Sequence, residues 1–215
     1  MEKEHKFFER VVRSDIPSLE KFVLELNDDL HDGLFPDITK EEVIAKKEIV
    51  GDAIGTSFAH KYNIFQFLNS DIRKLHQAIR DMTIEACDYY GVDFNKQEYM
   101  LQGWFNCDNK SSDNLNDLHD HCGGVGLPFF HGYYCVNAEP SVTHYQLDPK
   151  NNPEEIFENV NVNDRAILSV VGKPHRKGKW EQDSKRITIA YDMIPLSALG
   201  DNNDKNYLQH WVPLI

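Results

Sequence analysis

The chain has 215 residues, of which 40% are hydrophobic and 27% are charged, as in ordinary globular proteins. This length predicts one domain that can bury a sizeable core. The 35 acidic side chains outnumber the 23 basic ones and give a formal net charge of -12. Such a surface repels phosphate backbones, so we expect no nucleic-acid partner. No apolar run is long enough to predict a membrane span.

The cysteines and the N-terminal residues indicate in which cellular compartment the protein is expected. Cys87, Cys107, Cys122 and Cys135 include no C-x-x-C pair. The first ten residues are charged and lack the apolar stretch of a signal peptide. We therefore expect a cytoplasmic protein whose cysteines are free, structural thiols. The sequence leaves the oligomeric state open, a dimer included.

The first part of the chain predicts helices. Ser14 or Asp15 can cap a helix that has Pro17 in its first turn. Apolar side chains then recur at spacings of three and four, which predicts one buried face: Leu19, Phe22, Val23 and Leu26. A turn-rich stretch follows at 28–33, and a second helix is expected over 40–47.

The strongest helical pattern covers residues 71–90. Ser70 is a natural N-cap, and Gly91 can end the helix in a left-handed conformation. One face is apolar throughout: Ile72, Leu75, Ile79, Met82 and Ala86. We expect the helices of residues 1–95 to act as support for the remainder of the chain.

After Gly91 the pattern changes to short apolar or alternating runs separated by clusters of Asn, Asp, Gly and Pro. The expected strands are 98–107, 132–137, 142–147, 165–171 and 186–194. Short strands with turns between them are typical of a β-sandwich or barrel. The sequence thus predicts an α+β, mainly β chain with a β core at 96–197 and a tail at 198–215.

Two histidines form the first candidate metal motif. His119 and His121 follow a polar loop and precede a strand-like stretch. In an extended segment, residues i and i+2 point to the same side, so both imidazoles can face one point. A strand can supply two metal ligands in this way. His131 and His144 lie in predicted strands, where core packing is the default expectation; His131 could also line the pocket or act as an alternate ligand.

The second candidate motif lies further along the chain, where a strand leads into His175 and another begins at Arg186. We expect a hairpin connection that places the two residues on neighbouring strands. Alternation puts Arg186, Thr188 and Ala190 on one face. A buried arginine needs an anion, and a guanidinium beside a metal suits a dicarboxylate that chelates the metal with its other end.

Together the two motifs resemble the Fe(II)- and 2-oxoglutarate-dependent oxygenase superfamily. Its pattern is His-x-Asp, a distal His, an Arg about ten positions later, and Ser or Thr two positions after that. The residues around Trp104, Asn106 and the H-x-H pair are similar to a bacterial and phage branch of the superfamily. The resemblance covers about residues 101–191. It implies a double-stranded β-helix, that is, a cupin-like jelly-roll barrel with the N-terminal helices packed on it.

The resemblance also implies the chemistry. Fe(II) would be held by His119, His121 and His175. The distal carboxylate of 2-oxoglutarate would meet Arg186 and Thr188, with help from Asn106 and from Tyr133 or Tyr134. O2 would take the remaining iron position and lead to a ferryl intermediate that hydroxylates a small molecule or an amino-acid or peptidyl side chain.

The H-x-H pair departs from the common triad of two histidines and one carboxylate. Three ligand sets stay open: the three histidines, which we favour; one histidine replaced by Asp117 or Asp120; or a register with Gly123 in the carboxylate position, which resembles the radical halogenases. The alternative functions are a three-histidine cupin-type dioxygenase that needs no 2-oxoglutarate and a non-catalytic jelly-roll binding module.

Overall fold

The structure is a computed structural model that describes residues 4–51, 53–110, 117–121, 130–199 and 210–215. It contains two antiparallel sheets and three α-helices, which confirms the α+β class. The helices are α1 (Ile16–His31), α2 (Lys40–Val50) and α3 (Ser70–Tyr90). The strands are β1 (Phe8–Val11), β2 (Tyr99–Asp108), β3 (Phe130–Asn137), β4 (Val142–Tyr145), β5 (Phe157–Val160), β6 (Arg165–Val170), β7 (His175–Lys177), β8 (Arg186–Pro195) and β9 (Val212–Pro213). Within the described ranges, no helix is long and apolar enough to cross a bilayer.

Helix α1 begins as predicted. The Asp15 side chain accepts a hydrogen bond from the Ser18 N–H at 3.4 Å, and a proline occupies the first turn. The predicted apolar face is buried except at Phe22, which is half-buried. The helix continues to His31, beyond the expected turn at Asp28. The helix thus runs further than the polar sequence suggested, because Leu30 extends its buried face.

Helix α3 differs from the prediction at its N-terminus. Asn69, not Ser70, is the cap: its side-chain oxygen accepts from the N–H groups of Asp71 and Ile72 at 2.8 and 3.2 Å. Both residue types are good caps, so the sequence alone does not separate these neighbouring positions. Gly91 ends the helix with φ 75°, the left-handed conformation that glycine adopts without strain.

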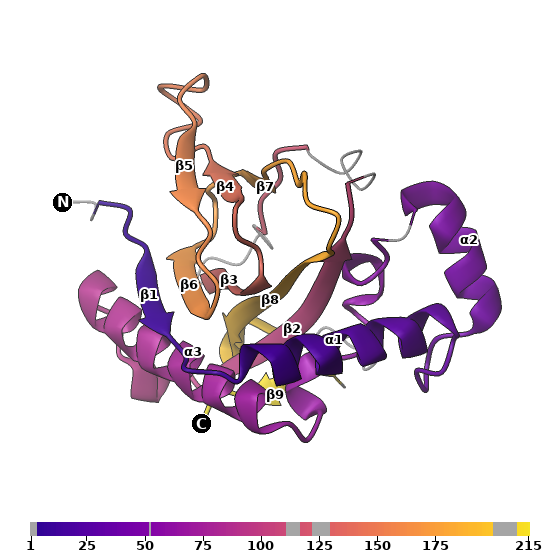
Figure 1. The fold of residues 1–215 in the computed structure, drawn as a ribbon. Helices are drawn as coiled ribbons and strands as arrows, with labels where there is room; N and C mark the ends of the chain where they lie inside the picture. Colours follow the sequence, from indigo (N-terminus) through magenta and orange to yellow (C-terminus); the bar gives the residue numbers. More distant parts are fainter. Residues whose placement is uncertain (1–3, 52, 111–116, 122–129, 200–209) are drawn as a thin grey trace.

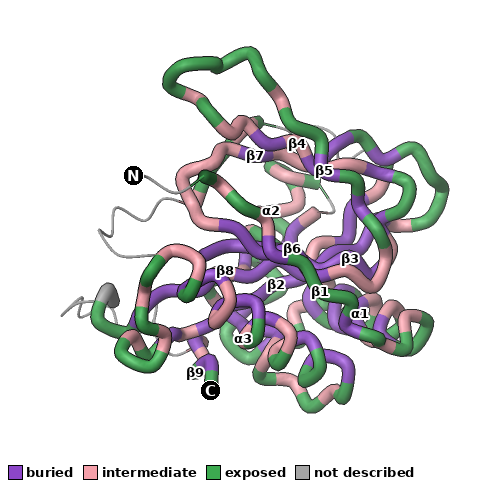
Figure 2. The backbone as a smooth tube through the Cα atoms, turned by 90° about the vertical axis from the view of Figure 1, so that its left-hand side faces the viewer, coloured by how far each residue is buried: buried purple, intermediate pink, exposed green. Residues whose placement is uncertain are grey.

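The large sheet has the strand order β1-β6-β3-β8-β2-β9. Helices α1 and α3 lie along one of its faces (Figure 1). Odd-numbered β8 residues face these helices and pack in the main core: Ile187, Ile189, Tyr191 and Met193. Buried residues follow the strands of this sheet (Figure 2). The even-numbered residues of β8 lie on the opposite face, which leaves Arg186 and Thr188 pointing away from the helices.

The small sheet, β5-β4-β7, lies on the side of the large sheet away from α1 and α3 (Figure 1). A second apolar cluster fills the space between the sheets: Tyr133, Cys135, Ala138, Tyr145 and Ile167. An antiparallel bridge between His119 and His175 adds residues 117–121 beside β7. The interior between the two sheets therefore receives side chains from both motifs that the sequence singled out.

One expectation about strand neighbours is wrong. His175 begins β7 in the small sheet, whereas Arg186 begins β8 in the large sheet, so the two residues lie on facing sheets and not on paired strands. The connection at 178–185 is long enough to cross from one sheet to the other. A turn-rich linker of this length does not say whether it closes a hairpin or changes sheets.

Candidate functional site

Three histidines predicted as ligands come together between the sheets. The ring centroids of His119 and His175 are 4.7 Å apart, those of His121 and His175 are 5.2 Å apart, and those of His119 and His121 are 5.6 Å apart. One ring nitrogen from each of the three lies within 4.8 Å of the other two. The group is therefore close enough to bind one cation.

Backbone pairing fixes this arrangement. The His119 N–H donates to the carbonyl oxygen of His175 at 3.1 Å, and the His175 N–H donates to that of His119 at 2.8 Å. On its other side, His175 pairs with Tyr145 of β4. His121 lies two residues beyond His119, and alternation returns its ring to the same side. The predicted geometry of the H-x-H pair thus arises from an extended segment at the edge of β7.

In each of these three histidines Nδ1 faces a hydrogen-bond acceptor. The acceptor is the carbonyl oxygen of Asp117 for His119, at 3.1 Å, and that of Lys173 for His175, at 3.3 Å. For His121 it is the Asp192 carboxylate, at 2.9 and 3.0 Å. A ligating histidine commonly donates its second N–H to such a partner. This pattern leaves the three Nε2 atoms for a metal, and imidazole nitrogen is a suitable ligand for Fe(II).

Asp192 was not among the predicted site residues. It lies on β8, directly across the strand pair from His131, and forms a second convergent group with His121 and His131. The alternation of the β8 sequence could have identified it. The alternation that groups Arg186 with Thr188 and Ala190 reaches Asp192 one step later.

His131 adds a fourth imidazole to the cluster. Its ring centroid lies 4.3 Å from that of His175 and 4.5 Å from that of His121. Its side chain is buried, and neither ring nitrogen has a hydrogen-bond partner among the described residues. Burial, and then the neighbouring histidines, hold the pKa of His131 well below its ordinary value. The ring is therefore neutral at pH 7, so one ring nitrogen can donate and the other can accept a hydrogen bond.

The pKa values of two of the predicted ligands, His175 and His121, are also shifted. The pKa of His175 falls to about 3, first because of burial and then because of His121 and His119. Burial works to lower the pKa of His121, but the hydrogen bond and charge of Asp192 outweigh it and raise that pKa. Neutral imidazoles at His175 and His131 suit metal binding, which requires a free nitrogen lone pair.

These shifts make the metal-free protein sensitive to acid. His131 and His175 stay neutral when folded but take protons when unfolded, so the unfolded state binds more protons below about pH 6.5. We expect the free energy of unfolding to fall as the pH drops below about 6.5, by up to about 1.4 kcal/mol per pH unit for each such histidine, until the folded-state pKa is reached. His121 acts in the opposite direction, because its pKa is raised.

Urea unfolding of chelator-treated protein at several pH values measures this slope. His131→Phe should make the slope shallower. A free energy of unfolding that does not change over this pH range would contradict the expectation.

Arg186 lies at the other end of the same β8 face and is buried, with 4% of its surface exposed. Its Nε donates to the Ser141 hydroxyl at 3.3 Å, and its Nη1 lies 3.4 Å from an Asp108 carboxylate oxygen. Asp108 also accepts from the Lys177 ammonium at 2.6 Å. Thr188 is buried one step along the strand. Ser141, Asp108 and Lys177 were not predicted, although Asp108 continues the alternation from Trp104 and Asn106.

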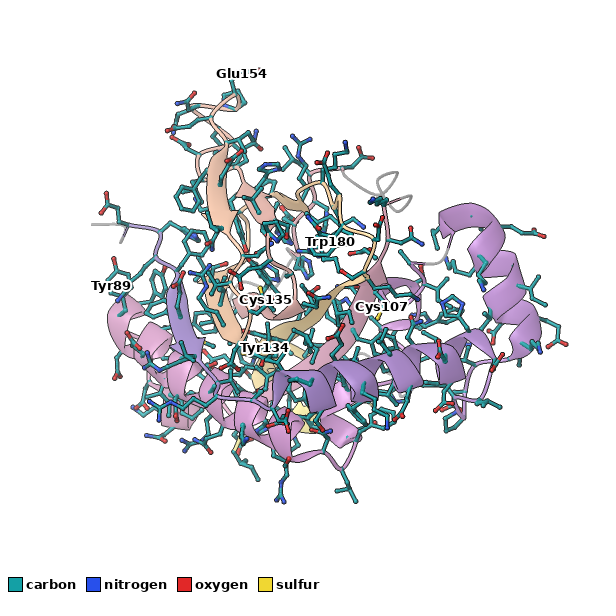
Figure 3. The ribbon with its side chains drawn as sticks, viewed as in Figure 1. Tyr89, Cys107, Tyr134, Cys135, Glu154 and Trp180 are labelled. Carbon is teal, nitrogen blue, oxygen red and sulfur yellow. The ribbon has the colours of Figure 1, made fainter. Side chains whose placement is uncertain are left out.

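Two other predicted cosubstrate contacts have different outcomes. Asn106 shares a face with Thr188, its cross-strand partner, and its side chain accepts a hydrogen bond from the Thr56 hydroxyl. Tyr134 lies away from Arg186: it faces the helices, and its hydroxyl donates to Asp164 at 2.9 Å. Its neighbour Cys135 faces the small sheet, as Figure 3 shows. The prediction for Tyr134 is corrected because the period of two turns its ring to the other side.

Tyr133 precedes Tyr134 in β3 and was the alternative cosubstrate contact that the resemblance implied. Its ring lies between the sheets. Its hydroxyl donates to Asn161 at 3.0 Å. Asn161 in turn donates to the same Ser141 hydroxyl that accepts from Arg186. Tyr133 thus reaches the arginine end of the interior through a hydrogen-bonded chain.

The other two ligand sets receive less support from the structure. Asp117 meets His119 through its carbonyl oxygen. Among the described residues, neither Asp117 nor Asp120 joins a convergent ligand group. Gly123, the residue of the halogenase-like register, lies outside the described residues, as does Cys122.

No protein-family model matches the sequence, and no curated protein matches it. Solved structures do resemble the fold. A non-heme monooxygenase, ThoJ in complex with nickel, aligns with a TM-score of 0.56 at 12% identity, over 89% of this chain and 74% of that one. The 2-oxoglutarate-dependent epimerase SnoN from nogalamycin biosynthesis aligns with a TM-score of 0.51 at 11% identity, over 89% and 78%.

EvdO2 from Micromonospora carbonacea var. aurantiaca, solved with 2-oxoglutarate, aligns with a TM-score of 0.50 at 10% identity, over 89% of this chain and 87% of that one. At these identities the likeness concerns the fold. The resemblance to the Fe(II)- and 2-oxoglutarate-dependent oxygenases is thus confirmed at the level of the fold, whereas the H-x-H branch is not addressed.

Proposed function

We propose, from the premise that this chain has the fold of the Fe(II)- and 2-oxoglutarate-dependent oxygenases, that it is such an oxygenase and acts as a hydroxylase. One observation carries the proposal. Three histidines whose Nδ1 atoms face acceptors each bring one ring nitrogen to within 4.8 Å of those of the other two. Arg186 lies on the same β8 face as Asp192, which contacts His121, so an anion anchor and a metal group share one interior.

The path of the chain supports a double-stranded β-helix. From β2 it passes to residues 117–121 beside the small sheet, returns to the large sheet with β3, and goes back with β4 and β5. It then enters the large sheet again with β6, the small sheet with β7 and the large sheet with β8. Repeated crossing between two facing antiparallel sheets is the connectivity of a jelly roll. This topology supports closure into a barrel around the site.

The protein's own residues supply binding, orientation and exclusion of water. His119, His121 and His175 would hold Fe(II), which together with 2-oxoglutarate and O2 supplies the oxidising chemistry. Arg186 and Thr188 would fix the distal carboxylate of the cosubstrate, as a guanidinium fork does well. The apolar cluster between the sheets would limit the access of water from that side. The Trp104 ring stacks on His121 with centroids 6.0 Å apart and limits its rotation.

Asp192 would act on the metal through His121. A carboxylate that accepts the second N–H of a ligand fixes the tautomer and increases the basicity of the ring. We expect Asp192→Asn to weaken metal binding about 10- to 100-fold, since loss of an outer partner has effects of this size. Competition with a chromophoric chelator measures it.

The matched control is Asp183→Asn, at an exposed aspartate that pairs with Lys110. It should leave metal affinity unchanged. Equal affinities of the Asp192→Asn protein and the parent protein would show that His121 does not depend on this carboxylate.

The function is tested by adding Fe(II) and then 2-oxoglutarate to the purified protein without oxygen. Chelation by the cosubstrate should produce a weak visible charge-transfer band, and admission of O2 should yield succinate. Absence of the band, of 2-oxoglutarate binding and of succinate would refute the proposal.

A three-histidine dioxygenase that uses no 2-oxoglutarate is the second candidate. It is favoured by one observation, that the group of His119, His121 and His175 contains no carboxylate. Metal spectra that do not respond to 2-oxoglutarate, together with oxygen consumption on addition of a thiol substrate, would select it.

A further inference from the structure

Three charged side chains meet between the sheets at the Arg186 end of the site. Asp108 ends β2, Lys177 ends β7, and Arg186 begins β8. The Asp108 and Arg186 side chains are 6% and 5% exposed, and that of Lys177 is 18% exposed. This contact joins the small sheet to the large one, so it links the strand of His175 to the strand of the anion anchor.

The formal charges do not cancel. Lys177 and Arg186 carry one positive charge each, and Asp108 carries one negative charge, which leaves one positive charge in excess. An unbalanced charge is costly in a low-dielectric interior unless it is paired. The hydrogen bonds of the Arg186 guanidinium to described residues use Nε and Nη1, so Nη2 is left to donate to a further acceptor. One added carboxylate would balance the group.

The two cations do not share Asp108 equally. Its carboxylate lies 2.6 Å from the Lys177 ammonium but 3.4 Å from Arg186. A short charge-assisted contact is the stronger one. The Lys177 ammonium therefore neutralises most of the negative charge of Asp108, and most of the positive charge of Arg186 is left without a partner in this group.

We infer that Lys177 is a positioning residue, which neutralises Asp108 so that Arg186 stays available to the distal carboxylate of the cosubstrate. The inference rests on the proposed function and deepens it. Without Lys177, Asp108 would pair fully with Arg186 and compete with the incoming carboxylate. Lys177 lies two residues after His175, and alternation gives both the same side of β7. The strand that holds a metal ligand thus also adjusts the charge at the far end of the cosubstrate.

Four proteins test the charge balance: the parent, Lys177→Met, Asp108→Asn and the double variant. Each is loaded with Ni(II), and 2-oxoglutarate binding is followed by calorimetry, which requires no turnover. We expect Lys177→Met to bind at least about tenfold more weakly, because its net charge is zero. Asp108→Asn should bind as tightly as the parent or more tightly. The double variant restores the single positive charge and should bind within about threefold of the parent.

Two further variants separate charge from fold. Lys177→Arg keeps the charge and should retain most of the affinity. Lys179→Met, at an exposed lysine that pairs with Glu181 at 2.7 Å, should behave as the parent. Thermal unfolding of every variant shows whether a change in affinity follows from loss of structure.

The outcomes are distinct. A parent protein that binds Ni(II) but not 2-oxoglutarate would overturn the proposed function and the inference with it. A parent that binds 2-oxoglutarate, with Lys177→Met binding equally well, would overturn the inference alone. A double variant as weak as Lys177→Met would also overturn it, since Lys177 would then act directly on the ligand and not through Asp108.

Discussion

Replacement of His175 with alanine is expected to abolish stoichiometric binding of Fe(II). His175 contributes one of three convergent nitrogens, and alanine removes this imidazole while it keeps the backbone bridge to His119. Loss of an outer-shell partner weakens metal binding about 10- to 100-fold, and loss of a ligand should weaken it more than that. Metal analysis after gel filtration, and chelator competition, measure the effect.

The matched control for this variant is His144→Ala. His144 lies on β4, the strand paired with β7, and contacts Glu158 at 3.3 Å without joining the cluster. It should retain one equivalent of iron. Retention of tight iron binding by the His175→Ala protein would mean that the metal is held elsewhere, with the group of His121, His131 and Asp192 as the nearest alternative.

Replacement of Arg186 with methionine is expected to eliminate 2-oxoglutarate binding while iron binding persists. A hydrogen bond to a charged group is worth about 1.5–3 kcal/mol, and a guanidinium can donate two to one carboxylate. The affinity should therefore fall about 100-fold or more. Folding should survive, because Asp108 keeps its contact with Lys177 when the arginine is absent.

Titration of 2-oxoglutarate into the iron-loaded protein without oxygen measures this affinity through the visible band. Arg186→Lys keeps the charge but loses the planar fork, so it should bind at an intermediate level. Arg10→Met is the control, since Arg10 pairs with Glu85 on the outer surface. Unchanged binding by the Arg186→Met protein would remove the arginine from the site.

Periodicity accounts for most of what the sequence predicts here. Spacings of three and four identify the buried faces of α1 and α3, because these helices bury one stripe against the large sheet. Alternation brings Arg186 and Thr188 to one face of β8. The same alternation, extended along β8 and β2, places Asp192 and Asp108 on this face too. These two residues were within reach of sequence reasoning.

Other features depend on tertiary structure. The short strand β7 has only three residues, too few for a periodic pattern, and its pairing partners come from distant parts of the chain. Nothing local shows that residues 178–185 carry the chain to the facing sheet. The contact of Lys177 with Asp108 forms only because β7 and β2 lie on opposite sides of one interior. Such a contact between sheets has no signature in the sequence.

The paired tyrosines of β3 show a different limit. Tyr133 and Tyr134 are adjacent and chemically equal, so the resemblance offered either as a cosubstrate contact. The structure separates them: the Tyr133 hydroxyl donates to Asn161 between the sheets, and the Tyr134 hydroxyl donates to Asp164 on the helix side. Only the register with β8 determines which tyrosine faces the site.

The most direct test is a crystal structure of the protein grown with Mn(II) and 2-oxoglutarate, with anomalous scattering to locate the metal. We expect one anomalous peak within bonding distance of the Nε2 atoms of His119, His121 and His175, and ligand density that reaches from the metal to the Arg186 guanidinium. A peak bound by His131 and Asp192 with His119 and His175 unligated, or density that leaves Arg186 without the cosubstrate, would contradict the account.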